Sequence, residues 1–296
     1  YPLVMGHEIS GEIVQAGQDA RRFSPGTKVV LFPLLPCGEC AGCREKRWAL
    51  CQNYDFFGSR RDGGFQEYLT APEWNLIPVP EKTEASLACL CEPIAVAVHA
   101  VKNLHLSKRE NTVAIIGAGI IGICAARMMR DKGHHVTMID RNEFKRSLCE
   151  EIGLSTVPIT DGSHMESEFD CVIEATGAVA MFHLSIQLAK QSGIVTWLGN
   201  IQDDILFEKK EISSILRKEL RIQGVWNSDY QAGSNDDWGE ALEFIGSSDW
   251  LHRVISDRIS LNELPAMLEK MYRLKSSHEK HAVHKVIVDI SSEDRG

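Results

Sequence analysis

The chain has 296 residues, of which 44% are hydrophobic and 25% are charged. This length and composition are typical of a globular protein with two domains. The formal net charge of -9 disfavours a nucleic acid or an anionic membrane surface as partner, because both repel an acidic protein. We recognise neither a signal peptide nor an apolar run long enough to span a membrane, and we therefore expect a cytoplasmic protein.

Residues 1–93 contain short apolar alternations, such as ISGEIVQAG, TKVVLF and FQEYL, which predict short antiparallel strands. The chain begins at Tyr1 without an initiator Met, and we expect that it starts inside a domain. His7 and Glu8 stand in MGHEISGEIV, and Glu92 stands in CEPIAVAVHA. A His–Glu pair is more often a hydrogen-bonded surface pair than a metal site, so spacing alone leaves both readings open.

Four cysteines stand in the run CGECAGCREKRWALC, at Cys37, Cys40, Cys43 and Cys51. The two-residue gaps let three thiolates converge on one ion, and the longer gap lets Cys51 complete a tetrahedral shell. Two disulfides are the alternative. In the reducing compartment that we expect, clustered cysteines usually bind metal, so we predict a structural zinc. Four thiolates leave this ion no open position for catalysis.

Residues 94–235 alternate apolar strand-like runs with helical patterns, which predicts an α/β fold with a doubly wound parallel sheet of the Rossmann type. The expected strands lie at 113–117, 136–140, 171–177 and 194–200, and the expected helices at 120–132, 143–152 and 180–191. Residues 236–296 contain two further helical patterns and a last strand, HKVIVDI.

The glycines Gly117, Gly119 and Gly122 form GAGIIG between the first of these strands and a helix, the context of a dinucleotide-binding turn. The helix start at Ile120 and Ile121 attracts the pyrophosphate. Asp140 ends the next strand, where a carboxylate accepts hydrogen bonds from the adenosine ribose and repels a 2′-phosphate. NAD is therefore favoured over NADP, although the adjacent Arg141 leaves the strictness of this choice open.

Five motifs occur in the order GHEISGEIV, the cysteine run, DGGFQEYL, EPIAVAVHA and VAIIGAGIIG. In this order they resemble the zinc-dependent medium-chain dehydrogenase/reductases, in particular the polyol branch. The resemblance implies a GroES-like catalytic domain at residues 1–93, whose opening strands are absent, and a Rossmann domain at residues 94–235. It also implies that residues 236–296 return to the catalytic domain, where the last strand completes the sheet.

The resemblance further implies that His7, Glu8 and Glu92 hold a catalytic zinc, with Glu8 or Glu92 bound directly or through water. The family's first catalytic ligand is a Cys upstream of the GHE motif, and this chain has only six residues before His7. An alternative is therefore a non-catalytic NAD-binding remnant.

Cofactor and substrate residues can be inferred by the same resemblance. The cofactor residues are Lys145 near the ribose, and Leu198, Gly199, Asn200, Val225, Trp226 and Asn227 near the nicotinamide. The stretches at 53–69 and 215–227 resemble a subgroup that oxidises galactitol 1-phosphate to tagatose 6-phosphate. Ser59, Arg60 and Arg61 would then bind the phosphate, because guanidinium groups bind phosphate in a bidentate manner.

A sorbitol- or threonine-type substrate is the alternative within this chemistry. The family usually assembles through the edge of the Rossmann sheet, so we expect a homodimer or homotetramer.

Overall fold

The computed structural model describes residues 2–106, 110–231, 236–277 and 282–290. The chain forms two compact units. Unit 1 comprises Tyr1–Val96, Asn227–Arg273 and Lys285–Gly296, and unit 2 comprises Ala97–Trp226 and Leu274–His284.

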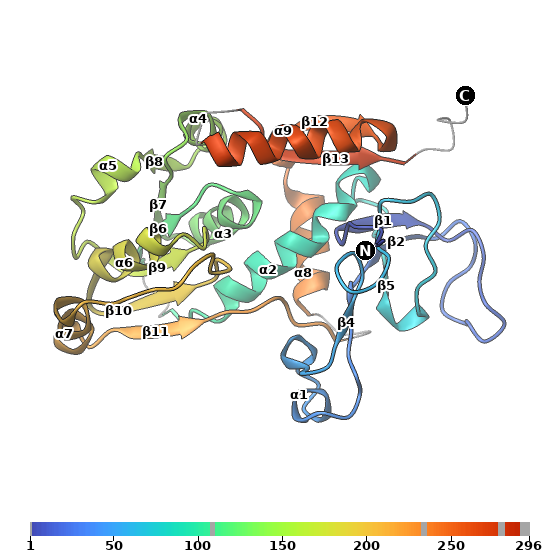
Figure 1. Cartoon of the computed structure of the whole chain (residues 1–296), viewed down its shortest axis with the longest axis horizontal. Coiled ribbons are helices and arrows are strands. Elements are labelled where there is room, and N and C mark those ends of the chain that lie inside the picture. Colours follow the sequence, from blue (N-terminus) through green and yellow to red (C-terminus); the bar gives the residue numbers. More distant parts are fainter. Residues whose placement is uncertain (1, 107–109, 232–235, 278–281, 291–296) are drawn as a thin grey trace. The chain divides into compact units, whose positions relative to one another are not determined.

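A parallel sheet of six strands forms the centre of unit 2, in the order β11-β10-β9-β6-β7-β8 (Figure 1). Its central strands are rich in Val and Ile that are fully buried, as expected where helices cover both faces. The strands are β6 (Thr112–Ile116), β7 (His135–Ile139), β8 (Ser155–Val157), β9 (Phe169–Glu174), β10 (Ala189–Trp197) and β11 (Arg221–Gly224).

The strand order of this sheet reverses between β6 and β9. The chain runs outward through β7 and β8 and then returns to the other side of β6. In doubly wound sheets, ligands bind at the carboxyl ends of the strands at such a reversal. The GAGIIG turn follows β6 directly and therefore lies at this position.

The helices of unit 2 pack against neighbouring strands of the sheet. α3 packs on β6 and β7, α4 on β7 and β8, α6 on β9 and β10, and α7 on α6 and β10. The side chain of Asn142 caps α4 by accepting from the Phe144 amide at 3.0 Å. The helices are α3 (Ile120–Asp131), α4 (Glu143–Glu151), α5 (Ile159–Gly162), α6 (Val179–Leu188) and α7 (Lys209–Lys218).

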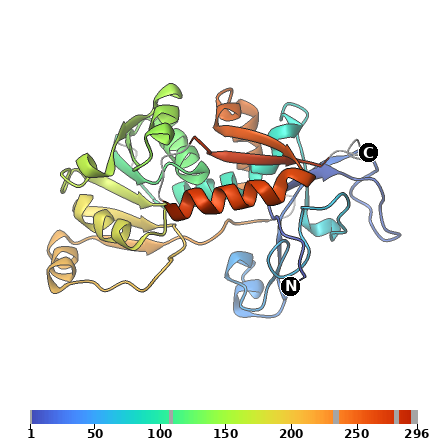
Figure 2. The same cartoon turned by 45° about the horizontal axis from the view of Figure 1, so that its top comes forward.

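Unit 1 is built from short strands. β1 (Ile9–Glu12), β2 (Lys28–Leu31) and β5 (Leu76–Pro78) form an antiparallel sheet, and β3 (Leu34–Leu35) pairs with β4 (Asp55–Phe56). A second pair, β12 (Ile255–Ser260) and β13 (Lys285–Asp289), lies side by side and parallel (Figure 2). The α-helices are α1 (Ala41–Arg44) and α8 (Asp237–Ser247), together with the first parts of α2 (Cys91–Lys102) and α9 (Leu264–Ser277).

The predicted α/β class with a doubly wound parallel sheet is confirmed, but three local predictions are wrong. The segment FQEYL is an irregular loop and not a strand. The helix predicted at 180–191 ends at Leu188, because the next residues already begin β10. The last strand pairs with β12 and not with the β1-β2-β5 sheet. Alternation of apolar residues identifies a strand's faces but does not identify its neighbour.

One helical segment among the described residues, Ala85–Lys102, is long and apolar enough to cross a membrane by length and composition alone. However, 72% of it is buried inside the protein. This burial is typical of a core helix, whose apolar residues are covered by the rest of the fold.

Candidate functional site

The four cysteines of the predicted structural zinc site form one cluster in unit 1. Their Sγ atoms all lie within 4.8 Å of one another. The Sγ–Sγ distances of 3.5 Å between Cys40 and Cys43 and 3.9 Å between Cys37 and Cys43 exceed a disulfide bond of about 2 Å. All nine cysteines of the chain lie within the described residues, and none of them forms a disulfide. The arrangement therefore fits a single tetrahedral ion, although metal binding itself stays a prediction.

The four thiols of this cluster differ in their surroundings. The Cys37 amide donates to the Cys51 Sγ at 3.3 Å. A backbone hydrogen bond at Gln52 lowers the pKa of Cys40 to about 6, so that this thiol is ionised at neutral pH. Burial raises the pKa of Cys43 to about 12, a cost that a bound cation would remove by stabilising the thiolate.

A second donor cluster brings together residues that are far apart in sequence. His7 and Glu8 precede β1, whereas Glu92 lies in the first turn of α2. One ligand atom of each of these three residues lies within 4.8 Å of the others. One imidazole and two carboxylates are donors that zinc accepts, and three protein ligands leave a position open for substrate, as in catalytic zinc sites.

A bound cation would stabilise the carboxylates of this second cluster, which are costly to ionise without one. Burial raises the pKa of Glu92 to about 8, and the carboxylate of Glu8 adds to this effect. Partial burial lowers the pKa of His7, which favours the neutral imidazole that binds metals. By contrast, the Lys285 ammonium on β13 forms an ion pair with Glu8 and would compete with a metal ion for this carboxylate. Sequence reasoning missed Lys285, because the pairing of β13 could not be read from the chain.

The two cysteines near Glu92 do not join this cluster. Cys91 is fully buried, and its thiol donates to the Trp238 carbonyl at 3.5 Å. Burial raises the pKa of Cys89 to about 11, which disfavours a thiolate there. Among the described residues, the donors around His7 are thus one nitrogen and two carboxylates, without sulfur.

The loop that carries the predicted phosphate-binding residues packs against the His7 segment. The Phe56 and His7 rings meet edge to face at 5.7 Å, and the Gly64 amide donates to the Gly6 carbonyl at 2.8 Å. A Cβ atom at Gly63 would lie 2.0 Å from the Gly6 carbonyl oxygen, so only glycine permits this approach.

Both arginines of this loop already have partners. The Arg60 guanidinium stacks on the Tyr54 ring at 3.8 Å and donates to the Tyr54 carbonyl at 2.5 Å. Arg61 pairs with Asp55 at 3.6 Å, and both side chains are about half exposed, at 44% and 45%. Ser59 is exposed on the same loop. A phosphate would therefore compete with Asp55 for Arg61.

The predicted dinucleotide turn has close backbone packing in unit 2. Gly117 has a φ of +109°, and a Cβ atom at Gly122 would lie 2.1 Å from the Gly117 carbonyl oxygen. Gly119 is the N-cap of α3, which begins with Ile120 and Ile121. Asp140 follows β7, and its carboxylate accepts from the Ala118 amide at 2.7 Å. The structure thus places the predicted ribose-binding carboxylate directly against the glycine turn.

The other predicted cofactor residues lie in the strand ends and in α4. Leu198 and Gly199 follow β10, and their amides donate to the Glu174 carbonyl at 2.9 and 3.0 Å. Asn200 is the next residue. After β11, Val225 is buried, Trp226 is 50% exposed and Asn227 has a φ of +58°. Lys145 is half-buried on α4.

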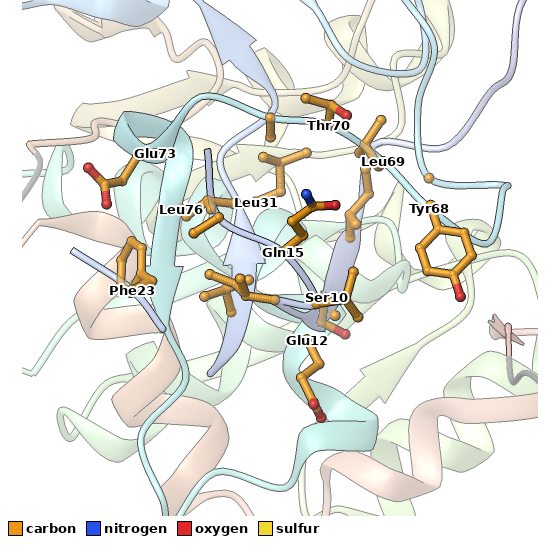
Figure 3. A pocket seen from close by; sticks show the side chains of 18 of the residues that line it. Ser10, Glu12, Gln15, Phe23, Leu31, Tyr68, Leu69, Thr70, Glu73 and Leu76 are labelled. Atoms are coloured by element: carbon orange, nitrogen blue, oxygen red, sulfur yellow. The ribbon is translucent and has the colours of Figure 1, made fainter. Parts of the chain in front are cut away.

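One cleft in the described part of the chain lies at neither donor cluster. It has a volume of about 960 Å³ and lies in unit 1 beside β1. Ser10, Glu12, Gln15, Tyr68 and Leu69 line it, together with apolar side chains of β2 and β5 (Figure 3). None of the predicted metal ligands is among its lining residues, so we assign it no catalytic chemistry.

Two family models match this chain. Residues 1–81 match the alcohol dehydrogenase GroES-like domain, and residues 121–247 match the zinc-binding dehydrogenase model. L-threonine 3-dehydrogenase of Shewanella woodyi is 34% identical over 235 residues, which cover 76% of this chain and 67% of that protein. Galactitol 1-phosphate 5-dehydrogenase of Escherichia coli K12 is 31% identical over 257 residues, which cover 83% of this chain and 73% of that protein.

A solved structure supports the same assignment. A Sinorhizobium meliloti 1021 protein, described as a zinc-binding dehydrogenase and bound to NADP, superimposes with a TM-score of 0.84. It is 30% identical, and the match covers 97% of this chain and 83% of that one. The chain therefore belongs to the zinc-binding dehydrogenases of the medium-chain type, as the motif resemblance predicted.

Proposed function

We propose that this protein is a zinc-dependent dehydrogenase that transfers hydride from a sugar alcohol to NAD. The observation that carries this proposal is the convergence of His7, Glu8 and Glu92 within 4.8 Å. These three residues would hold the catalytic zinc, whereas Cys37, Cys40, Cys43 and Cys51 would hold the structural one. The GAGIIG turn with Asp140 would bind the dinucleotide.

The chain's own residues would prepare the substrate hydroxyl for this reaction. When bound, zinc supplies a Lewis acid that lowers the pKa of the substrate hydroxyl, and NAD supplies the hydride acceptor. His7 offers a neutral imidazole, because partial burial lowers its pKa. Without a bound metal, burial raises the pKa of Glu92 to about 8, and zinc binding would release that proton, because a ligating carboxylate must be ionised.

We propose NAD as the preferred cofactor. The support is Asp140, whose carboxylate would repel a 2′-phosphate, although the related Sinorhizobium meliloti protein was solved with NADP. Dissociation constants for NADH and NADPH test this choice. We expect at least about tenfold tighter binding of NADH, and equal affinities would contradict the proposal.

The proposed substrate is galactitol 1-phosphate, which would give tagatose 6-phosphate. Arg61 supports this choice, because it lies on a loop that packs against the His7 segment and is held by a solvent-exposed ion pair that a phosphate can replace. L-Threonine is the second candidate, and the 34% identity to a threonine dehydrogenase favours it. We propose that the protein is cytoplasmic and assembles through the edge strand β11 into a homodimer or homotetramer.

The decisive experiment compares NADH formation from galactitol, galactitol 1-phosphate, sorbitol and L-threonine, with the zinc content measured on the same sample. Preference for galactitol 1-phosphate over galactitol, and its loss in Arg61→Ala, would support the phosphate assignment. Equal rates with both would contradict it. One zinc per chain and no turnover on any of the four would instead favour the non-catalytic remnant.

A further inference from the structure

Glu174 is a buried acidic residue that the proposed chemistry does not use. It ends β9, and its side chain is 0% exposed. In the sheet it lies beside Ile116 of β6 and Trp197 of β10, at the carboxyl ends of the strands. These are the two neighbours from which the glycine turn and the Leu198–Asn200 loop begin. A buried carboxylate is costly to desolvate, so its partners matter.

The partners of the Glu174 carboxylate are donors from the loop that follows β9. It accepts from the Thr176 amide at 2.7 Å and from the Gly177 amide at 3.0 Å, and the Thr176 hydroxyl also donates to it. Its backbone carbonyl accepts from the Leu198 and Gly199 amides at 2.9 and 3.0 Å. One residue thus holds the loops after β9 and β10 together.

These loops are packed so closely that no side chain separates them. A Cβ atom at Gly199 would lie 2.1 Å from the Gly177 nitrogen and 2.5 Å from the Glu174 Oε2. A Cβ atom at Gly117 would lie 2.7 Å from the Thr176 Cγ2. Glu174 therefore connects, through Thr176 and Gly199, the glycine turn and the loop where we place the nicotinamide.

We propose that Glu174 is a positioning residue, which fixes the nicotinamide loop relative to the pyrophosphate-binding turn. This inference rests on the proposed function for the identity of the cofactor. A dinucleotide binds tightly only if both halves of its site are correctly spaced at the same time. The Asp140 carboxylate accepts from the Ala118 and Asn142 amides and shares no hydrogen bond with Glu174 in the described part of unit 2, so the adenosine half should act independently of Glu174.

The test separates the two halves of the cofactor by measuring dissociation constants for NADH and for AMP with the 296-residue chain. In Glu174→Ala we expect the NADH dissociation constant to rise about tenfold or more, because several hydrogen bonds are lost. The AMP constant should stay within about twofold, because AMP spans Asp140 and the glycine turn but does not reach the Leu198–Asn200 loop. Thr176→Val, which removes the hydroxyl but keeps the side chain's shape, should raise the NADH constant by about threefold.

Two further variants serve as controls. Glu150 on α4 accepts from the Thr156 hydroxyl in an exposed pair of the same chemistry, so Glu150→Ala should change neither constant. If Glu174→Ala misfolds, the near-isosteric Glu174→Gln still tests the charge, and unchanged AMP binding reports that unit 2 is folded. Equal weakening of NADH and AMP, or no weakening of either, would overturn the proposal.

Failure of the role proposed for Glu174 can be distinguished from failure of the dehydrogenase assignment. A wild-type chain that binds NADH but oxidises no alcohol would refute the dehydrogenase assignment and leave the role of Glu174 intact. Weaker binding of NADH but not of AMP in Glu174→Ala supports the role of Glu174, and this result needs no turnover measurement. A wild-type chain that binds AMP but no NADH would overturn both.

Discussion

The two donor clusters of unit 1 are assembled in different ways. The cysteines come from one short run, between Cys37 and Cys51, whereas the second cluster joins His7 and Glu8 to Glu92 from the start of α2. The first cluster offers four thiols, and the second offers one nitrogen and two carboxylates beside a lysine. A closed, local cluster therefore suits a structural ion, whereas an open cluster built from distant segments suits catalysis.

The largest expected effect comes from removing the nitrogen donor of the open cluster. In His7→Ala we expect NADH formation to fall by about a thousandfold, because the Lewis acid is lost, while zinc at the cysteines is retained. Metal analysis together with initial rates measures this. If His7→Ala loses both zinc ions, or keeps both with full activity, the assignment of a separate catalytic ion to His7 is contradicted.

Removing a donor from the closed cluster should instead affect stability. We expect Cys43→Ser to lose the structural zinc and to lower the free energy of unfolding by about 3 kcal/mol or more. Urea unfolding with zinc analysis checks this, and Cys89→Ala, outside both clusters, serves as the matched control. Unchanged stability after loss of that zinc would show that the ion does not stabilise the segment between Cys37 and Cys51.

The buried carboxyl of Glu92 predicts a pH dependence for the open cluster when that cluster holds no metal. Its pKa rises from 4.5 to about 8 on folding, so the folded chain keeps a proton that the unfolded chain has released. The free energy of unfolding should therefore fall by about 1.4 kcal/mol per pH unit as the pH rises between these values. Denaturation at pH 5.5, 6.5 and 7.5 measures this slope. Glu92→Gln should flatten it, and an equal slope in both proteins would contradict the assignment.

The smallest effect concerns the lysine beside the open cluster. Lys285 neutralises Glu8 and places a positive charge near the metal ligands. In Lys285→Met we expect zinc to bind the second cluster about threefold to tenfold more tightly, because Glu8 is freed and the repulsion is removed. Lys285→Arg keeps the charge and is the control. Chelator competition gives both constants, and weaker binding in Lys285→Met would reverse the interpretation.

The nature of each site explains how much of it could be predicted. The cysteine cluster and the GAGIIG turn depend on residues that are close in sequence, so spacing alone indicated their chemistry. The open cluster could not be derived from spacing, because His7 and Glu92 are brought together only by the fold; a motif resemblance suggested it. The loop at 65–69 was wrongly predicted as a strand, since its apolar alternation continues without strand pairing.

The α/β class, the glycine turn after β6 and the cluster of four cysteines all followed from the sequence alone. Each follows from short-range periodicity or spacing, which are set by the geometry of single strands, helices and loops. Tertiary structure alone decided that Lys285 pairs with Glu8, that β13 pairs with β12, and that Glu174 links two loops. These contacts join residues or strands whose proximity depends on the packing of the whole chain, and no local pattern encodes that packing.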